Sequence, residues 1–168
     1  MNYDNNRHNA HNEIDHIFQD LFPTRNMAER PEQAALCHRM LDAMVEGGIA
    51  LCDAGTGIGK TYAYLVAGTV YSRFRAACGL RPKPILVSTS SIALQTAARD
   101  EYLPLLSELL TEDGMIAQPL QAVIRKGKSH YVCDTRLEQR LGQMDLQKKN
   151  WKAGAALLSL RGQLDMDE

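Results

Sequence analysis

The chain has 168 residues, of which 45% are hydrophobic, so it is long enough for one compact domain with a buried core. Its 19 lysine and arginine residues nearly balance its 20 aspartate and glutamate residues, which excludes a strong overall field toward nucleic acid or anionic membrane. The first residues lack the apolar core of a secretory signal, and no segment reaches the roughly 18 consecutive apolar residues of a membrane span. We therefore expect a cytoplasmic protein with no membrane partner.

Two helices are expected before residue 49. Residues 1–12 have the composition of a polar tail, and the apolar residues within 12–22 indicate a short helix that Pro23 ends. Apolar residues recur at helical spacing over 35–45, and a glycine pair at 47–48 stops that pattern.

Three short apolar runs, 49–52, 85–88 and 122–124, have the character of strands buried in a parallel sheet. Helices are expected between them, at about 60–77 and 92–102, with Pro104 interrupting the second. Strands that alternate with helices predict an α/β fold with parallel strands. The last part of the chain, Leu137–Leu164, is expected to form one or two polar helices.

A glycine-rich segment follows the first apolar run and matches the Walker A pattern of a P-loop, with alanine at the first glycine position. Its residues are Ala54, Gly55, Thr56, Gly57, Ile58, Gly59, Lys60 and Thr61. The glycines allow backbone N–H groups to face phosphate oxygens, and the start of the following helix attracts the same anion. We expect Lys60 to reach the β- and γ-phosphates of ATP and the Thr61 hydroxyl to coordinate Mg²⁺, which makes these two the candidate catalytic residues.

The P-loop with its preceding Asp53 resembles motif I of superfamily 2 helicases, in the branch that contains DinG and XPD. About twenty residues upstream, Arg30 and Gln33 are similar to the R-x-x-Q segment of that branch. The resemblance implies that the glutamine amide reads the adenine edge through one donor and one acceptor.

Two further phrases resemble the same family. Residues 85–95 are similar to motif Ia, which implies single-stranded DNA binding by Thr89, Ser90, Ser91 and Gln95; simple capping of a helix by these hydroxyls is the alternative. Residues 125–133 are similar to the phrase that leads into an iron–sulfur domain, in which Cys133 is the first of four thiolate ligands. A buried or surface thiol is the ordinary role of a lone cysteine and is expected for the other three.

The resemblance implies a RecA-like partial motor domain over 28–125, preceded by a tail and short helix over 1–27. It is followed over 126–168 by a mainly helical segment, the start of an iron–sulfur-type insertion. The function implied is that of the N-terminal part of an ATP-dependent 5′–3′ DNA helicase in repair or replication. Its partners would be single-stranded DNA and further helicase domains, and a 4Fe–4S cluster is implied in a longer protein only.

The 168 residues contain neither a D-E-A-H acidic motif nor a second RecA-like domain with its arginine finger. Phosphoryl transfer depends on such charge-stabilising groups, so we expect this chain alone to bind nucleotide weakly and hardly hydrolyse it.

Two alternatives stay open. One is a short nucleotide-binding or interaction protein derived from a helicase. The other is a small P-loop kinase, in which Arg136, Arg140 and Arg161 would supply the lid.

Overall fold

The computed structural model describes residues 3–127 and 130–147, and the chain divides into two compact units, 1–124 and 125–168. The described part of the first unit contains α-helices and two π-helical turns, which follow one another in this order: α1 (Tyr3–His16), η1 (Ile17–Leu21), α2 (Phe22–Thr24), α3 (Pro31–Glu46), α4 (Lys60–Ala77), α5 (Ile92–Ala97), η2 (Ala98–Tyr102) and α6 (Leu103–Glu112). The second unit contains α7 (Asp134–Gln147). None of the helices in the described ranges is long and apolar enough to cross a membrane.

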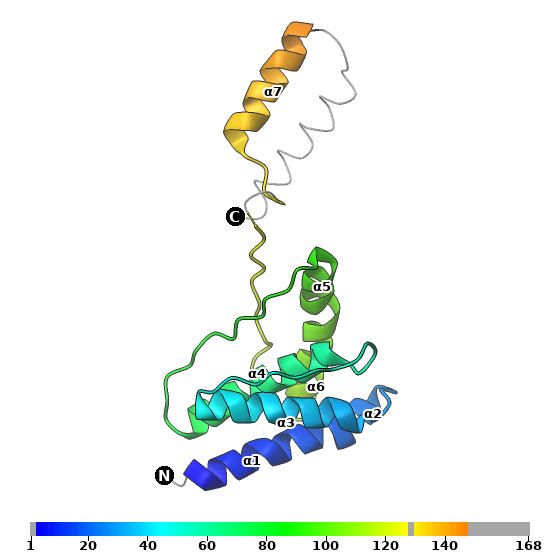
Figure 1. The fold of residues 1–168 in the computed structure, drawn as a ribbon, viewed down its shortest axis with the longest axis vertical. Coiled ribbons are helices and arrows are strands. Elements are labelled where there is room, and N and C mark those ends of the chain that lie inside the picture. The colour runs from blue at the N-terminus through cyan, green and yellow to red at the C-terminus, as the bar shows by residue number, and fades with distance from the viewer. Residues whose placement is uncertain (1–2, 128–129, 148–168) are drawn as a thin grey trace. The chain divides into compact units, whose positions relative to one another are not determined.

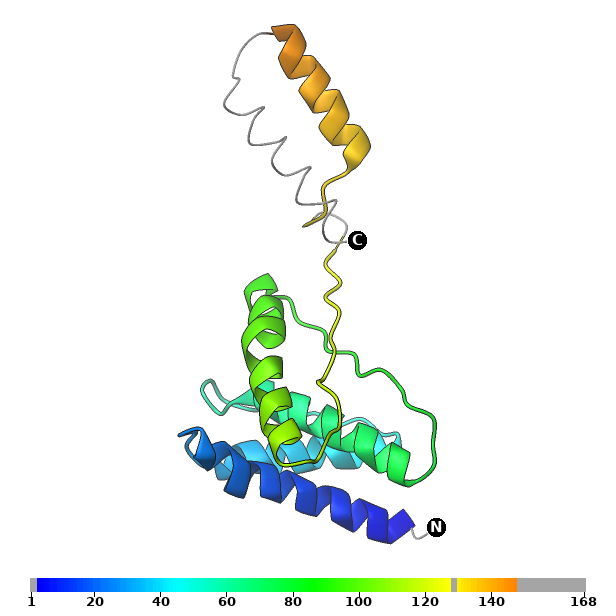
Figure 2. The same ribbon diagram turned by 180° about the vertical axis from the view of Figure 1, so that it is seen from behind.

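The first unit is built around three helices, α1, α3 and α4, which lie side by side in both views (Figures 1 and 2). Their facing sides bury one apolar cluster to which α6 also contributes. Its largest fully buried members are Ile14, Ile17, Phe22, Leu41, Val66, Val70, Leu106 and Leu110. Burial of this cluster is the main favourable term that holds the helices together.

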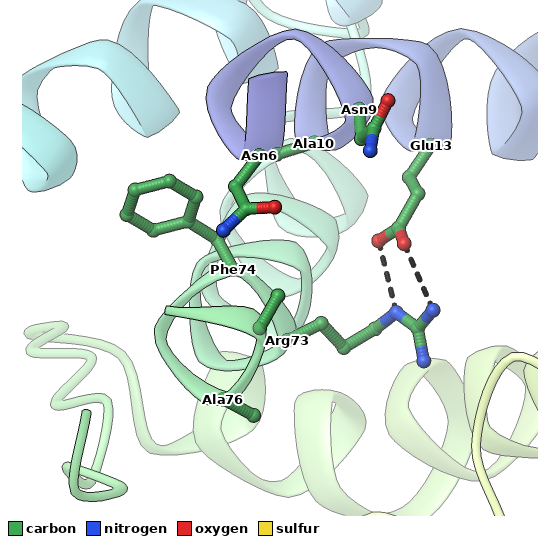
Figure 3. Close-up of a pocket in the computed structure, with 8 residues that line it drawn as sticks. Asn6, Asn9, Ala10, Glu13, Arg73, Phe74 and Ala76 are labelled. Carbon is green, nitrogen blue, oxygen red and sulfur yellow. Dashed lines mark hydrogen bonds and ion pairs between the residues drawn. The ribbon is translucent and has the colours of Figure 1, made fainter. Parts of the chain in front are cut away.

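Polar contacts fix α1 on α4 beside this core. Arg73 of α4 forms a two-pronged ion pair with Glu13 of α1, at 2.8 and 2.9 Å, and also donates to the carbonyl of Met115. Figure 3 shows the pair at the edge of a small hollow of about 230 Å³ that Asn6 and Asn9 also line. An arginine–carboxylate pair of this geometry orients the two helices as well as attracting them.

The boundaries of α3 and α4 follow local signals. Pro31 stands at the first position of α3, where its missing N–H costs nothing, and Gly47 ends the helix in the left-handed region with φ 67°. Helix α4 occupies Lys60–Ala77, the range expected from the sequence.

Two π-helical turns lie next to Pro23 and Pro104, the prolines that we expected to end or interrupt helices. The N–H of Phe22 bonds to the carbonyl of Ile17, and the N–H of Leu103 bonds to that of Ala98, each five residues back and next to a proline. This wider turn accommodates a residue that cannot donate and whose ring crowds the preceding turn. The chain therefore stays helical through Pro23, to Thr24, and through Pro104, to Glu112.

The expected α/β fold with parallel strands is wrong for the described residues. Over 3–127 and 130–147 no strand forms, and the segments 49–52, 85–88 and 122–124 are non-helical chain without ladder partners. Figure 1 shows the second of them as part of a long open loop between α4 and α5. Side chains expected in the interior of a sheet are exposed: Ile49 by 92%, Leu51 by 96% and Leu86 by 93%. A parallel strand is stable only when neighbouring strands take up its backbone hydrogen bonds, and apolar composition alone does not supply them.

The expected polar tail is also wrong, because residues 3–12 belong to α1. In the second unit, α7 includes residues 137–147 of the expected helical region, and residues 148–164 lie outside the described residues.

Candidate functional site

The glycine-rich loop 54–61 ends where α4 begins, so Lys60 and Thr61 occupy the first turn of a helix of 18 residues. Gly57 and Gly59 have φ of 86° and 87°, in the left-handed region that favours glycine. Gly59 is the N-cap and provides no side-chain hydrogen bond to the helix. The positive end of α4 is therefore available to an anion that approaches the loop.

Two residues at the start of α3 donate hydrogen bonds to backbone carbonyls of this loop. Gln33, which is only 4% exposed, donates from Nε2 to the Gly59 carbonyl at 2.6 Å, and Arg30 donates to the Gly57 carbonyl. Both therefore contact the backbone at the glycines with positive φ. The Gln33 contact occupies one of the two N–H donors of its side-chain amide.

Lys60 lies at the mouth of the loop with its side chain folded onto the loop itself. Its ammonium donates to the carbonyls of Ala54 at 2.9 Å and Gly55 at 2.6 Å. Both acceptors are neutral and the lysine is exposed, so the charge of Lys60 has no carboxylate partner in these contacts. A phosphate oxygen is a stronger acceptor for an ammonium group than a peptide carbonyl is.

Tyr62 supports the first turn of α4 and was not anticipated from the sequence. Its ring packs edge-on against Phe22 at 5.0 Å and against Tyr102 at 5.2 Å between centroids. Burial, and then the neighbouring Tyr102 and Glu101, raise the pKa of Tyr62. This aromatic contact connects the P-loop helix to α2 and η2, and an aromatic residue directly after the Lys-Thr pair is the signal that could have indicated it.

The motif Ia segment caps α5. Ser91 Oγ accepts from the N–H of Leu94 at 3.2 Å, and Thr89 Oγ1 accepts from the N–H of Ser91 at 3.2 Å. Ser90 is exposed, whereas the Oε1 atom of Gln95 is buried and without a hydrogen-bond partner. The Ser91 hydroxyl thus performs the capping that was the alternative to DNA binding.

The four cysteines differ in exposure. Cys37 is buried in the core and Cys78 is half-buried, whereas Cys52 and Cys133 are exposed. Burial, and then the charge of Asp15, raise the pKa of the Cys37 thiol well above its usual range. Cys133 precedes α7, and its carbonyl accepts from the N–H of Leu137. Within the described ranges no three His, Cys, Asp or Glu side chains converge as metal ligands, so those residues do not by themselves fit an iron–sulfur cluster.

Comparison with known proteins gives relatives named DinG and YoaA. The chain is 32% identical over 117 residues to a Bacillus subtilis protein named 3′-5′ exonuclease DinG, covering 70% of this chain and 11% of that protein. It is 36% identical over 111 residues to the ATP-dependent DNA helicase YoaA of Escherichia coli, covering 66% and 15%. It is 34% identical over 122 residues to the ATP-dependent helicase DinG of Mycobacterium tuberculosis, covering 73% and 17%.

The chain therefore spans between 11% and 17% of the length of these relatives. No model of a protein family matches it, and no solved structure matches it.

Proposed function

We propose that this chain, which is homologous to part of the DinG-like helicases, binds the polyphosphate of ATP with loop 54–61 and the start of α4. One observation carries the proposal. An exposed loop with two glycines of positive φ leads directly into Lys60 and Thr61 on the first turn of a long helix that has no side-chain cap. A helix start of this kind attracts phosphate through both its N–H groups and its dipole.

Each residue of the loop has a distinct role in the proposed site. Backbone N–H groups at Gly57, Gly59 and Lys60 donate to phosphate oxygens, and the Lys60 ammonium leaves its two carbonyl acceptors to bind the β- and γ-phosphates. Thr61, on the same turn, supplies a hydroxyl to Mg²⁺. Gln33 holds the backbone of the loop so that its donors are arranged before the ligand arrives.

The wider activity is proposed from the relatives. Two of them are named ATP-dependent helicases, and we propose that this chain contributes the nucleotide-binding part of such an enzyme, which acts on DNA in repair or replication. From the resemblance to the DinG branch we also propose 5′–3′ movement along single-stranded DNA. The proposed DNA contacts are made by Thr89, Ser90, Ser91 and Gln95. Cys133 is proposed as a ligand of an iron–sulfur cluster.

The test of the proposal is nucleotide binding by the 168-residue chain. A fluorescent ATP analogue with Mg²⁺ should bind the native chain, and Lys60→Ala should weaken binding roughly 10- to 100-fold, because a hydrogen bond to a charged group contributes about 1.5–3 kcal/mol. Lys83→Ala is the matched control, since Lys83 is an exposed lysine in the loop before α5. Equal affinities for the native chain and Lys60→Ala would overturn the proposal.

A further inference from the structure

A line of polar side chains joins α1 to α3 beside the apolar core. Arg7 contacts Asp42 at 2.6 Å and Glu46 at 2.7 Å. Further along, His11 and Asp15 of α1 face Asp42 and His38 of α3. The α1 positions are four residues apart and their partners run in the opposite direction, as expected for antiparallel helices. These half-buried contacts contain a pair of histidines that the nucleotide site does not use.

The rings of His11 and His38 contact each other directly. Their Nδ1 atoms are 2.7 Å apart and the ring planes differ by 24°. The opposite nitrogen of each ring faces a carboxylate on the other helix: His11 Nε2 lies 3.0 Å from Asp42, and His38 Nε2 lies 2.9 Å from Asp15. Two histidine–aspartate contacts therefore link α1 to α3, in addition to the contact between the rings.

This geometry determines how many protons the histidine pair holds. Each Nε2 faces an acceptor-only carboxylate and must carry a proton to donate. The 2.7 Å contact between the two Nδ1 atoms requires one more proton, because two lone pairs repel there and two N–H groups collide. Three protons on four ring nitrogens give the pair a single positive charge. No third ligand converges on it among the described residues, so the contact fits a bridging proton rather than a metal ion.

The charged groups around the histidine pair are three carboxylates and one guanidinium. Asp15 of α1 and Asp42 of α3 face it directly, and Arg7 and Glu46 follow next along the interface. Partial burial raises the pKa of Asp42, but the hydrogen bond from Arg7 and the charge of His11 outweigh it, so the net pKa lies below its usual value.

Two other ionisable groups, Glu13 and Cys37, lie on α1 and α3. The buried thiol of Cys37 stays neutral because its pKa is raised. The carboxylate of Glu13, on α1, is paired with Arg73 of α4.

We propose that His11 and His38 share one proton and fasten α1 to α3 only while the pair carries a single positive charge. Addition of a second bridging proton forces two N–H groups together, and loss of the shared proton leaves two facing lone pairs. Either change breaks the contact between the rings. The helix affected, α3, is also the helix whose first turn holds the P-loop through Gln33.

The stability that the histidine pair contributes should depend on pH, because the folded and unfolded chains bind different numbers of protons at these two residues. Histidines of an unfolded chain change charge near pH 6.5. Well below that pH the unfolded pair binds one proton more than the folded pair, so stability falls as the pH falls. Well above it the folded pair binds one proton more, so stability falls as the pH rises. The stability contributed by the pair is therefore greatest near pH 6.5, and the unfolding equilibrium constant changes by up to about tenfold per pH unit on either side.

Two measurements on the 168-residue chain test the proposal. Nitrogen-15 NMR at pH 6.5 should show scalar coupling between the two Nδ1 atoms and a proton on both Nε2 atoms, and the coupling should disappear at pH 5. Denaturant unfolding from pH 5.5 to 8 should give a stability maximum in the native chain. His38→Gln should lose the decrease on the acid side, which corresponds to a change of about threefold in the unfolding equilibrium constant between pH 6.5 and pH 5.5.

His8→Gln is the matched control, because it removes an exposed histidine from the same helix, and it should keep the native profile. Asp15→Asn removes one carboxylate while keeping an acceptor oxygen, and should shift the maximum if His38→Gln does not fold. Absence of the coupling at every pH, or parallel pH profiles for the native chain and His38→Gln, would overturn the proposal.

Discussion

Gly59 meets two structural demands at a single position. Its backbone has φ 87°, and a Cβ added there would lie 2.8 Å from Cδ of Gln33 and closer still to its amide nitrogen. Gly57 has nearly the same φ, yet a Cβ there would meet no atom within 4 Å. Gly57 therefore needs only the left-handed backbone, whereas Gly59 needs both that backbone and the space beside Gln33.

The comparison of Gly59→Ala with Gly57→Ala follows from this difference. Both substitutions should reduce the free energy of unfolding by about 1–2 kcal/mol, the cost of a left-handed backbone with a side chain. Gly59→Ala should cost a further amount of about 0.5–1.5 kcal/mol, because it displaces Gln33 from the Gly59 carbonyl. Denaturant unfolding measures both values, and equal losses would show that the Gln33 contact contributes nothing.

At the level of the elements, short-range signals predicted α3 and α4 well. Apolar spacing, Pro31 and Gly47 specify α3 locally, and the Walker A pattern places Lys60 at the start of α4. The N-terminal half of α1 was missed because its partners are polar: Arg7 and His11 bind acidic groups of α3, which apolar periodicity does not register. The contacts behind the P-loop depend on how α3 packs against α4, and local sequence does not reveal that packing.

His16 contacts one aspartate in η1 and another just after α6, and its charge is expected to contribute to stability. Its ring contacts Asp20 at 2.7 Å and Asp113, just after α6, at 3.2 Å. The hydrogen bond to Asp20, and then that to Asp113, raise the pKa of His16. A histidine whose pKa is higher in the folded state stabilises the fold below its unfolded value of about 6.5 and loses that contribution as the pH rises through the folded value.

We expect His16→Gln to reduce stability at pH 6 by less than about 1 kcal/mol, since the side chain is partly exposed and its charge is screened. The reduction should become smaller toward pH 9, where the native histidine is neutral. Denaturant unfolding of both chains at the two pH values measures this difference. A reduction that grows with pH would contradict the assigned direction of the shift.

Across the first unit as a whole, the main error of the sequence prediction concerns long-range pairing. Residues 49–52 and 85–88 have strand-like composition, but whether a strand forms depends on neighbours distant in sequence, and none pairs with them in the described ranges. The helices succeed because each satisfies its own backbone hydrogen bonds. The described part of the first unit therefore has a helical core, and exposed apolar residues lie in its non-helical segments.

Leu51→Asn tests this arrangement. Leu51 is 96% exposed, so its replacement should change the free energy of unfolding by no more than about 0.5 kcal/mol. Leu41→Ala is the buried counterpart, and because Leu41 is fully buried on α3 it should cost about 2–5 kcal/mol. A loss at Leu51 as large as that at Leu41 would show that the segment is packed in a core.

Nucleotide binding at the P-loop can be tested by an NMR titration of the nitrogen-15-labelled chain with Mg²⁺ and ATP. We expect the backbone amides of Gly57, Gly59, Lys60 and Thr61 to shift most, because they form the proposed phosphate site. The side-chain amide of Gln33 should shift with them, because it donates to the Gly59 carbonyl. Saturating nucleotide that leaves these amides unmoved, or that shifts only residues around the hollow at Asn6 and Asn9, would contradict the proposal.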